Sequence, residues 1–190
     1  MIHEVIVSTV GAEGAVHLAP MGIHDHPEGW VIAPFRPSLT LDNLLVNPAA
    51  VINCTDDVRV FAGCLTGRRE WPVCPANRVK GVILADSLAV AEVAVARIED
   101  DPVRPRFICR VVDETCLRPF RGFNRAQAAV IEAAILVSRL RMLPAEQVAQ
   151  QFQALAVAVA KTAGDAEQEA WGWLVQAVEE FRLQATEAAP

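Results

Sequence analysis

Hydrophobic and polar residues alternate along most of the first 118 residues, with the period of two that is typical of β-strands. Residues 11–14 form the turn of a hairpin near the start of the chain, and residues 100–105 form the turn of a second, longer hairpin. Six or seven short strands of this kind predict a closed or partly closed β-barrel. The strands are expected at residues 3–10, 15–21, 30–35, 50–54, 82–84, 89–99 and 106–113.

The pattern changes near residue 118, where apolar residues begin to recur at the three- and four-residue spacing of helices. Asn124 and Gln127 have the spacing of a capping box at the start of a first helix, and Pro144 opens a second one. A third helix follows, and the short connections predict an antiparallel three-helix unit. The predicted class is therefore α+β, with a barrel domain over residues 1–118 and a helical domain over residues 119–190.

One short helix is expected among the strands, after a turn rich in proline. Pro34 and Pro37 prevent a regular strand through this turn, and Pro48 ends the helix. Ser38 and Thr40 are both candidate N-caps. The apolar face of the helix is expected to consist of Leu41, Leu44 and Leu45.

The start of this helix combines several groups that can bind a phosphate. A helix N-terminus offers unpaired backbone N–H groups and the positive end of the helix dipole. Arg36 lies just before it, and Ser38, Thr40 and Asn43 add hydroxyl and amide donors. The same residues also fit a capped surface helix with a solvated arginine, and the local sequence alone favours that interpretation over a phosphate site.

Composition limits the classes of protein that remain. The chain has 190 residues, 53% of them hydrophobic, which is enough for a substantial core. The net charge of −6, without a basic cluster, argues against a nucleic-acid partner. No apolar run is long enough to cross a membrane and the start does not resemble a signal peptide, so a cytoplasmic protein is expected. The five cysteines lack metal-site spacing and are expected to be buried thiols.

Two further polar segments carry candidate chemistry. His24 and His26 could bind a metal, but few other ligands lie nearby in the sequence, so a solvated loop without a metal is expected there. The segment Arg118–Arg125 carries three arginines between the barrel and the helices. It is either a linker whose arginines pair with surface carboxylates or a second anion-binding patch.

Three segments of the barrel half resemble the FMN-binding split-barrel flavoproteins. They are Ala19–Gly22, the turn Arg36–Thr40 with the helix that follows it, and the strand Val51–Asp57. The segment Phe123–Ala134 is similar to a subfamily of unknown function that has an added C-terminal helical domain. The resemblance covers nearly the whole chain and implies an FMN-binding split β-barrel followed by a three-helix domain.

The resemblance also implies a cofactor, a partner and site residues. Members of the family are homodimers with FMN at the subunit interface, so FMN and a second copy of the chain are expected. The FMN phosphate would contact Arg36, Ser38, Thr40 and Asn43. The flavin ring would face the backbone of Met21 and Gly22 and the side chains of Asn53 and Thr55. Candidates for the substrate side, or for the domain junction, are Arg121, Asn124 and Arg125.

The expected function is that of an FMN-binding flavoprotein acting as an oxidoreductase on a substrate that the sequence does not name. The subfamily resemblance implies a link to tetrahydromethanopterin-dependent one-carbon metabolism, and no residue is identified as catalytic. Two alternatives stay open. One is a non-catalytic flavin or nucleotide carrier, and the other is a structural or assembly protein whose function resides in the helical unit. Reduction of the flavin by NAD(P)H separates the enzyme from the carrier.

Overall fold

The structure, a computed structural model, describes residues 1–187. The chain forms two compact units. The first contains Met1–Asp56 and Arg69–Phe120, and the second contains Asp57–Arg68 together with the residues from Arg121 onward. The chain therefore enters the helical unit twice, which the sequence did not indicate. The predicted α+β class, a barrel followed by three helices, is confirmed.

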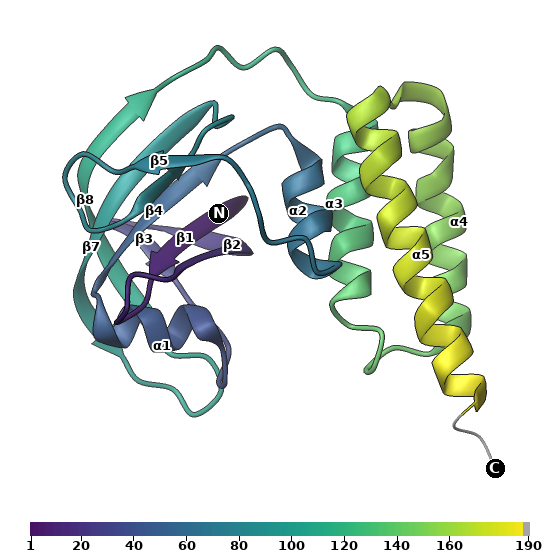
Figure 1. Cartoon of the computed structure of the whole chain (residues 1–190), viewed down its shortest axis with the longest axis horizontal. Coiled ribbons are helices and arrows are strands. Elements are labelled where there is room, and N and C mark those ends of the chain that lie inside the picture. Colours follow the sequence, from purple (N-terminus) through teal and green to yellow (C-terminus); the bar gives the residue numbers. More distant parts are fainter. Residues whose placement is uncertain (188–190) are drawn as a thin grey trace. The chain divides into compact units, whose positions relative to one another are not determined.

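Six strands of the first unit close into a barrel in the order β1-β2-β3-β8-β7-β4, and every neighbouring pair is antiparallel (Figure 1). Alternate side chains of these strands point inward, and Val5, Ile52 and Phe107 are among the residues that fill the barrel. The strands are β1 (Ile2–Val10), β2 (Val16–His26), β3 (Gly29–Ile32), β4 (Ala49–Cys54), β7 (Ala89–Glu99) and β8 (Arg106–Cys116).

Strand β2 is longer than the sequence indicated. It was expected to end near Met21-Gly22 and to be followed by a polar loop, but it continues to His26 and pairs there with β3. Pro20 does not interrupt it, because only β1 pairs with β2 at that point and a strand edge tolerates a residue without an N–H group. His24 and His26 are thus strand residues, and the expected loop at this position was wrong.

Helix α1 (Leu39–Val46) closes one opening of the barrel. Leu41 and Leu44 belong to the barrel core, whereas Leu45, expected on the same face, is exposed. Thr40 and Asn43 are buried as well, and the Asn43 side-chain amide donates a 3.0 Å hydrogen bond to Thr9 Oγ1 of β1. The helix is therefore held to the barrel by both apolar packing and a buried polar contact.

A two-stranded sheet of β5 (Val73–Pro75) and β6 (Val82–Leu84) covers part of the outer surface of the barrel. Ile83 packs against Val51 and Val90, so β4 is buried on both faces, as its continuous apolar sequence predicted. The turn between β5 and β6 is fixed by Glu92 of β7, whose buried carboxylate accepts hydrogen bonds from the backbone N–H groups of residues 77, 78 and 79.

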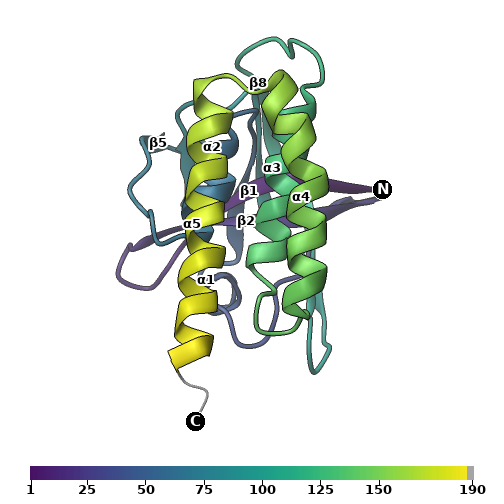
Figure 2. The ribbon, with the colours of Figure 1, turned by 90° about the vertical axis from the view of Figure 1, so that its right-hand side faces the viewer.

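In the part of the second unit that the structure describes, all regular secondary structure is helical (Figure 2). Its apolar core joins Val58 and Ala62 of α2 to Val130 and Ala134 of α3 and to Leu174 of α5. The rings of Phe152 in α4 and Trp171 in α5 lie 5.3 Å apart. The helices are α2 (Val58–Leu65), α3 (Arg125–Val137), α4 (Ala145–Thr162) and α5 (Asp165–Glu187).

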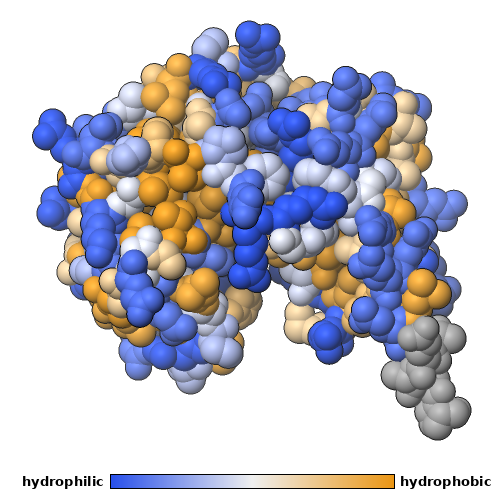
Figure 3. All heavy atoms as spheres, in the orientation of Figure 1, coloured by the Kyte–Doolittle hydropathy of each residue, from blue (hydrophilic) through white to orange (hydrophobic). Residues whose placement is uncertain are grey.

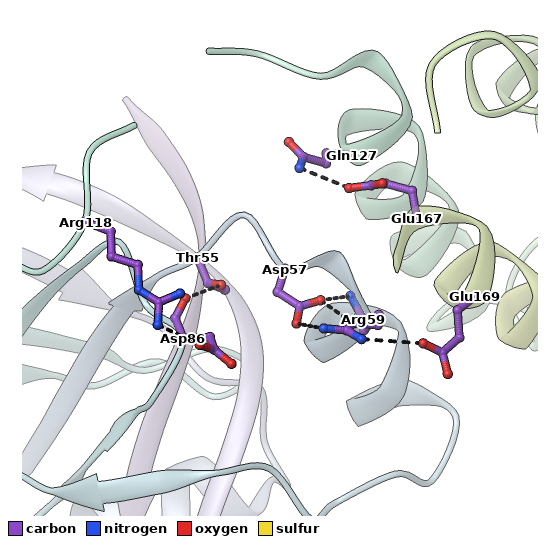
Figure 4. Close-up of polar contacts among 8 residues, drawn as sticks. All are labelled: Thr55, Asp57, Arg59, Asp86, Arg118, Gln127, Glu167 and Glu169. Carbon is purple, nitrogen blue, oxygen red and sulfur yellow. Dashed lines mark hydrogen bonds and ion pairs between the residues drawn. The ribbon is translucent and has the colours of Figure 1, made fainter. Parts of the chain in front are cut away.

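The helix ends of this unit are fixed by side chains, but not in the way expected. Asn124 caps α3 by accepting a 2.7 Å hydrogen bond from the N–H of Ala126. Gln127 does not complete a capping box, because its amide donates to Glu167 of α5 instead (Figure 4). The other carboxylate oxygen of Glu167 accepts from the Gly164 N–H and so caps the start of α5.

The cysteines also differ from the expectation. Cys109 is buried in the barrel core, and burial raises the pKa of its thiol to about 12. Cys54, Cys74 and Cys116 are exposed, so the prediction of five buried thiols was wrong for these three. They lie at or near strand ends, where the alternating pattern no longer decides which face is buried.

Among residues 1–187, no helix combines the length and apolar character that a membrane span requires.

Replacing Leu174 by alanine should destabilise the helical unit by about 2–5 kcal/mol, because a fully buried leucine leaves a cavity among α2, α3 and α5. Urea unfolding followed by circular dichroism at a helical wavelength measures this loss. Leu183→Ala on the same helix is the matched control, since Leu174 is 0% exposed and Leu183 65% exposed. Equal stabilities of the two variants would contradict the packing described here.

Candidate functional site

The segment between β3 and α1 is an exposed turn of the barrel unit that carries charged and polar groups. Ala33 and Pro34 are buried as β3 ends, and the chain then emerges so that Phe35, Arg36 and Pro37 are exposed. Ser38 has an extended backbone and its Oγ accepts a 3.3 Å hydrogen bond from the N–H of Leu41, which makes Ser38 the N-cap of α1. Of the two predicted caps, the structure selects Ser38.

Arg36 is held by the loop that joins β7 to β8. Its backbone N–H donates to the carbonyl of Val103 at 2.8 Å, and its Nε donates to the carbonyl of Asp101 at 3.2 Å. Its Nη2 lies 2.8 Å from Asp100 Oδ1. The arginine is therefore positioned through both backbone and side chain, at the start of α1.

The Arg36–Asp100 ion pair is open to solvent, with the two side chains 40% and 83% exposed. An exposed pair of this kind contributes about 0–1 kcal/mol, because water screens the charges and both side chains lose freedom. An incoming anion can therefore compete with Asp100 for the guanidinium. The backbone contacts would still hold Arg36 in place.

Asp101 gives the β7–β8 loop its shape. Its Oδ1 accepts hydrogen bonds from the backbone N–H groups of Arg104 at 2.6 Å and of Val103 at 2.8 Å. These two hydrogen bonds, Arg104 first, lower the pKa of the Asp101 carboxyl. The turn that they close directs Arg104 back toward the end of β3.

Arg104 is a second cation at this turn, and sequence reasoning missed it. Its Nε donates a 2.7 Å hydrogen bond to the carbonyl of Ala33, and its guanidinium lies over the ring of Phe35, 4.9 Å from the ring centre. The two arginines are 68 positions apart in the sequence. Only the pairing of β3 with β8, in which Ile32 lies opposite Phe107, brings them together.

Two guanidinium groups, a hydroxyl and the N-terminus of an eight-residue helix thus meet at one exposed turn. Guanidinium groups and helix N-termini both favour a phosphate or carboxylate group. The chemistry of this donor set fits a phosphate monoester.

The other predicted phosphate residues lie deeper than expected. Thr40 and Asn43 are buried beneath the start of α1, and the Asn43 amide is used in its hydrogen bond to Thr9. An added methyl group at Gly11 would lie 3.0 Å from Asn43 Oδ1, so the strand end packs closely against this side chain. Both residues support the turn from below in this structure.

The residues predicted to face the ring lie in two different places. Met21 and Gly22 are partly exposed in β2, opposite Val5 and Glu4 of β1, and Met21 packs against the barrel core. Asn53 is fully buried. Its amide donates to the carbonyls of Ile6 and Val51 and accepts from the N–H of Leu84, so the side chain ties β1, β4 and β6 together.

Thr55 follows β4, and its hydroxyl donates to the carbonyl of Asp86 at 3.4 Å. The carboxylate of Asp86 in turn binds Arg118 at 2.8 Å, so these three residues form a polar cluster at the edge of the barrel unit (Figure 4). Arg118, one of the three arginines near residue 120, therefore pairs with a surface carboxylate, as the linker interpretation predicted for it.

Arg121, Asn124 and Arg125 belong to the helical unit. Both polar atoms of the Asn124 side chain form hydrogen bonds: the oxygen caps α3, and the nitrogen donates to the carbonyl of Thr162 at the end of α4. Arg121 and Arg125 are exposed. Within residues 1–187, no group of three or more His, Cys, Asp or Glu side chains forms a metal-binding cluster.

Solved structures with the same fold include several flavin proteins. An FMN-bound protein of the DUF447 family from Methanosarcina mazei matches with a TM-score of 0.80 and 20% identity, over 93% of this chain and 94% of that one. The flavin reductase HpaC in complex with NADP⁺ matches with a TM-score of 0.53 and 16% identity, over 65% and 82% of the two chains. A 2-nitrobenzoate 2-nitroreductase from Pseudomonas fluorescens matches with a TM-score of 0.52 and 17% identity, over 60% of this chain and 64% of that one.

At these identities the matches establish the fold. Curated proteins gave no match to the chain. The N-terminal domain model of DUF447, a protein family of unknown function, matches residues 3–118, and a second DUF447 model matches residues 124–176. The chain therefore belongs to the DUF447 family.

Proposed function

We propose that this protein binds FMN and that the phosphate of FMN lies at the start of α1. The observation that carries the proposal is the convergence of Arg36 and Arg104 on the N-terminus of a helix capped by Ser38. A phosphate monoester carries nearly two negative charges at neutral pH, and two guanidinium groups can balance them. The FMN-bound relative of the same fold supports the choice of FMN.

When bound, FMN would supply the capacity to accept and donate electrons or hydride. The residues of this chain would fix the cofactor and shape its surroundings. Arg36 and Arg104 would bind the phosphate, and Thr40 and Asn43 would support the turn from below, where they are buried. Met21 and Gly22 are partly exposed in β2 and remain the proposed contacts of the ring. Asn53 is enclosed between strands, so it would affect the flavin site indirectly, by fixing the positions of those strands.

We propose further that the protein is an oxidoreductase. The support is that other proteins of this fold are described as a flavin reductase and a nitroreductase. The link to tetrahydromethanopterin-dependent one-carbon metabolism is a proposal that depends on the subfamily resemblance alone. Arg121 and Arg125, both exposed, remain candidates for the substrate side. A non-catalytic flavin carrier would bind FMN equally well but would not be reduced by NAD(P)H.

We also propose a homodimer with the flavin at its interface. Three exposed apolar residues border the arginine turn: Phe35 at 58%, Leu39 at 50% and Val103 at 59% exposure. On the face shown in Figure 3, hydrophobic surface gathers over the barrel and hydrophilic residues surround it. Apolar surface beside a charged site is suited to a subunit interface, because burying it favours association while the charges bind the ligand.

The proposed location is the cytoplasm. Cys54, Cys74 and Cys116 are exposed and form no disulfide. Exposed thiols of this kind persist in a reducing compartment and tend to be oxidised outside it.

The purified protein should be yellow, and the ligand released on denaturation should have the mass of FMN. The turn offers charge for one phosphate group, and the glycines of the chain do not form a dinucleotide-binding motif. Mass spectrometry of the released ligand checks this. Recovery of FAD in preference to FMN, or of a nicotinamide nucleotide alone, would refute the proposed cofactor.

Arg36→Ala should weaken FMN binding by about 1.5–3 kcal/mol, the range for hydrogen bonds to charged groups. Arg104→Gln should have an effect of similar size. Riboflavin lacks the phosphate and should bind the parent and both variants about equally. Fluorescence titration with the two flavins measures the difference.

The control for these two variants is Arg106→Ala, which removes an equal charge from an exposed arginine paired with Glu99 on the same hairpin. It should leave FMN affinity unchanged. If Arg36→Ala and Arg106→Ala behave alike, the turn is an ordinary capped surface helix.

Leu39→Gln should weaken the dimer roughly tenfold, because it removes an apolar side chain from the proposed interface without adding charge. Sedimentation velocity over a dilution series measures the dissociation constant. Val157→Gln makes the same type of change at an exposed position of α4 and should have no effect. A parent protein that is monomeric at all concentrations would contradict the dimer.

A further inference from the structure

The loop between β7 and β8 holds Arg36 partly through an acidic side chain. Two oxygen atoms of the loop lie against one edge of the guanidinium: the Asp101 carbonyl accepts from Nε at 3.2 Å, and Asp100 Oδ1 accepts from Nη2 at 2.8 Å. The Nε–Nη2 edge carries two N–H groups that point the same way, and arginine uses such an edge to bind a carboxylate or a phosphate through two hydrogen bonds. The loop therefore offers Arg36 the same pattern of oxygen atoms that a bound oxyanion would offer.

The shape of the loop is set by groups other than the Asp100 side chain. Asp101 Oδ1 accepts hydrogen bonds from the N–H groups of Val103 and Arg104. The N–H of Arg36 donates to the carbonyl of Val103 and so joins the loop to the turn before α1. The Asp100 side chain is 83% exposed, so its carboxylate can turn into the solvent while these contacts remain.

A phosphate that binds Arg36 can meet the Asp100 carboxylate in two ways. It can take the place of the carboxylate on the guanidinium, in which case the ion pair is lost. It can also bind beside the carboxylate, in which case two negatively charged groups lie close together and repel each other. Both arrangements cost free energy, and a flavin without a phosphate avoids this cost.

We propose that Asp100 is an internal competitor of the FMN phosphate and that it sets how readily the flavin exchanges. The inference rests on the proposed function, because it concerns the same phosphate site. The carboxylate is tethered to the loop, so it stays near Arg36 at a high effective concentration and can return to the guanidinium as the phosphate leaves. Because the ion pair is exposed and therefore weak, it lowers the affinity for FMN without blocking the site. FMN would then be an exchangeable ligand of this protein.

The test replaces Asp100 by asparagine in the full chain, which removes the charge and keeps the size of the side chain. Asp100→Asn should bind FMN about two- to fivefold more tightly than the parent, as expected from the upper part of the range for an exposed ion pair. Riboflavin lacks the phosphate, so it should bind the parent and the variant about equally, which also shows that the variant is folded. Fluorescence titration with both flavins measures the affinities. Release of FMN on dilution, followed by the recovery of flavin fluorescence, should be slower in the variant.

Glu99→Gln is the matched control for the loss of one negative charge. Glu99 precedes Asp100 in the chain, but its carboxylate lies 3.3 Å from Arg106 Nη1 and 3.4 Å from Arg97 Nη2. The variant therefore leaves the contact between Asp100 and Arg36 intact, and solvent screens its more distant effect on the phosphate. FMN affinity should stay close to that of the parent. A gain as large as that of Asp100→Asn would mean that the general charge of the hairpin matters, and it would overturn the proposed competition.

A double-mutant cycle tests whether the competition is for Arg36. Arg36→Ala removes the group that the carboxylate and the phosphate would share. In that background, Asp100→Asn should change FMN affinity much less than it does in the parent. An equal gain with and without Arg36 would overturn the proposal.

The outcomes separate this inference from the function on which it rests. A parent protein that binds FMN no better than riboflavin would overturn the phosphate site itself, and the role of Asp100 with it. A parent that prefers FMN, together with an Asp100→Asn variant that binds FMN equally well or more weakly, would overturn the role of Asp100 alone. In that case the carboxylate would be indifferent to the phosphate or would help to orient Arg36.

Discussion

The contact between the β3–α1 turn and the β7–β8 loop is the constraint on which the proposed flavin site depends. The turn cannot continue the sheet because of its prolines, and a surface turn without partners would not hold an arginine in one place. Two of the hydrogen bonds between these segments run in opposite directions: Arg36 N–H donates to the carbonyl of Val103, and Arg104 Nε donates to the carbonyl of Ala33. The loops exchange donors reciprocally, so each fixes the other.

That contact depends in turn on barrel closure. The β3–β8 pairing is the only ladder that places residues 33–38 beside residues 100–105 within the described strands, and it joins segments more than 70 positions apart. The buried carboxylate of Glu92 has a comparable role on the other side of the barrel. It accepts hydrogen bonds from three backbone N–H groups and so fixes the covering sheet over β1 and β4. Asn53 of β4 adds a second buried contact to this sheet, because its side-chain oxygen accepts from the N–H of Leu84 in β6. Polar side chains in this barrel therefore position its loops.

Local pattern was sufficient to predict most of the elements. Alternation placed the strands, and Ser38 and Asn124 marked the starts of two helices, since both signals depend on residues within one turn or strand. The sequence could not reveal Arg104 as a partner of the turn, because that relation depends on strand pairing. Nor could it show that Asn43 and Asn53 are buried. A side-chain amide can form hydrogen bonds to a ligand or to neighbouring strands in the interior equally well. For the same reason, the assignment of these residues to a flavin site stays a prediction.

Helix α2 shows most clearly why the domain organisation was harder to predict than the elements. It lies between two segments of the barrel unit in the sequence, yet Val58 and Ala62 pack with α3 and α5. Asp57 caps α2 and binds Arg59, whose guanidinium also lies 3.6 Å from Glu169 of α5 (Figure 4).

The segment after residue 120 therefore lacks part of its own core unless α2 is present. Arg68, the last residue of this inserted segment, places its guanidinium over the ring of Trp173 in α5, 4.0 Å from the ring centre. The helical unit is thus not an appendage that could be removed or added without consequence. Its core is completed by a segment that the chain supplies before the barrel is finished.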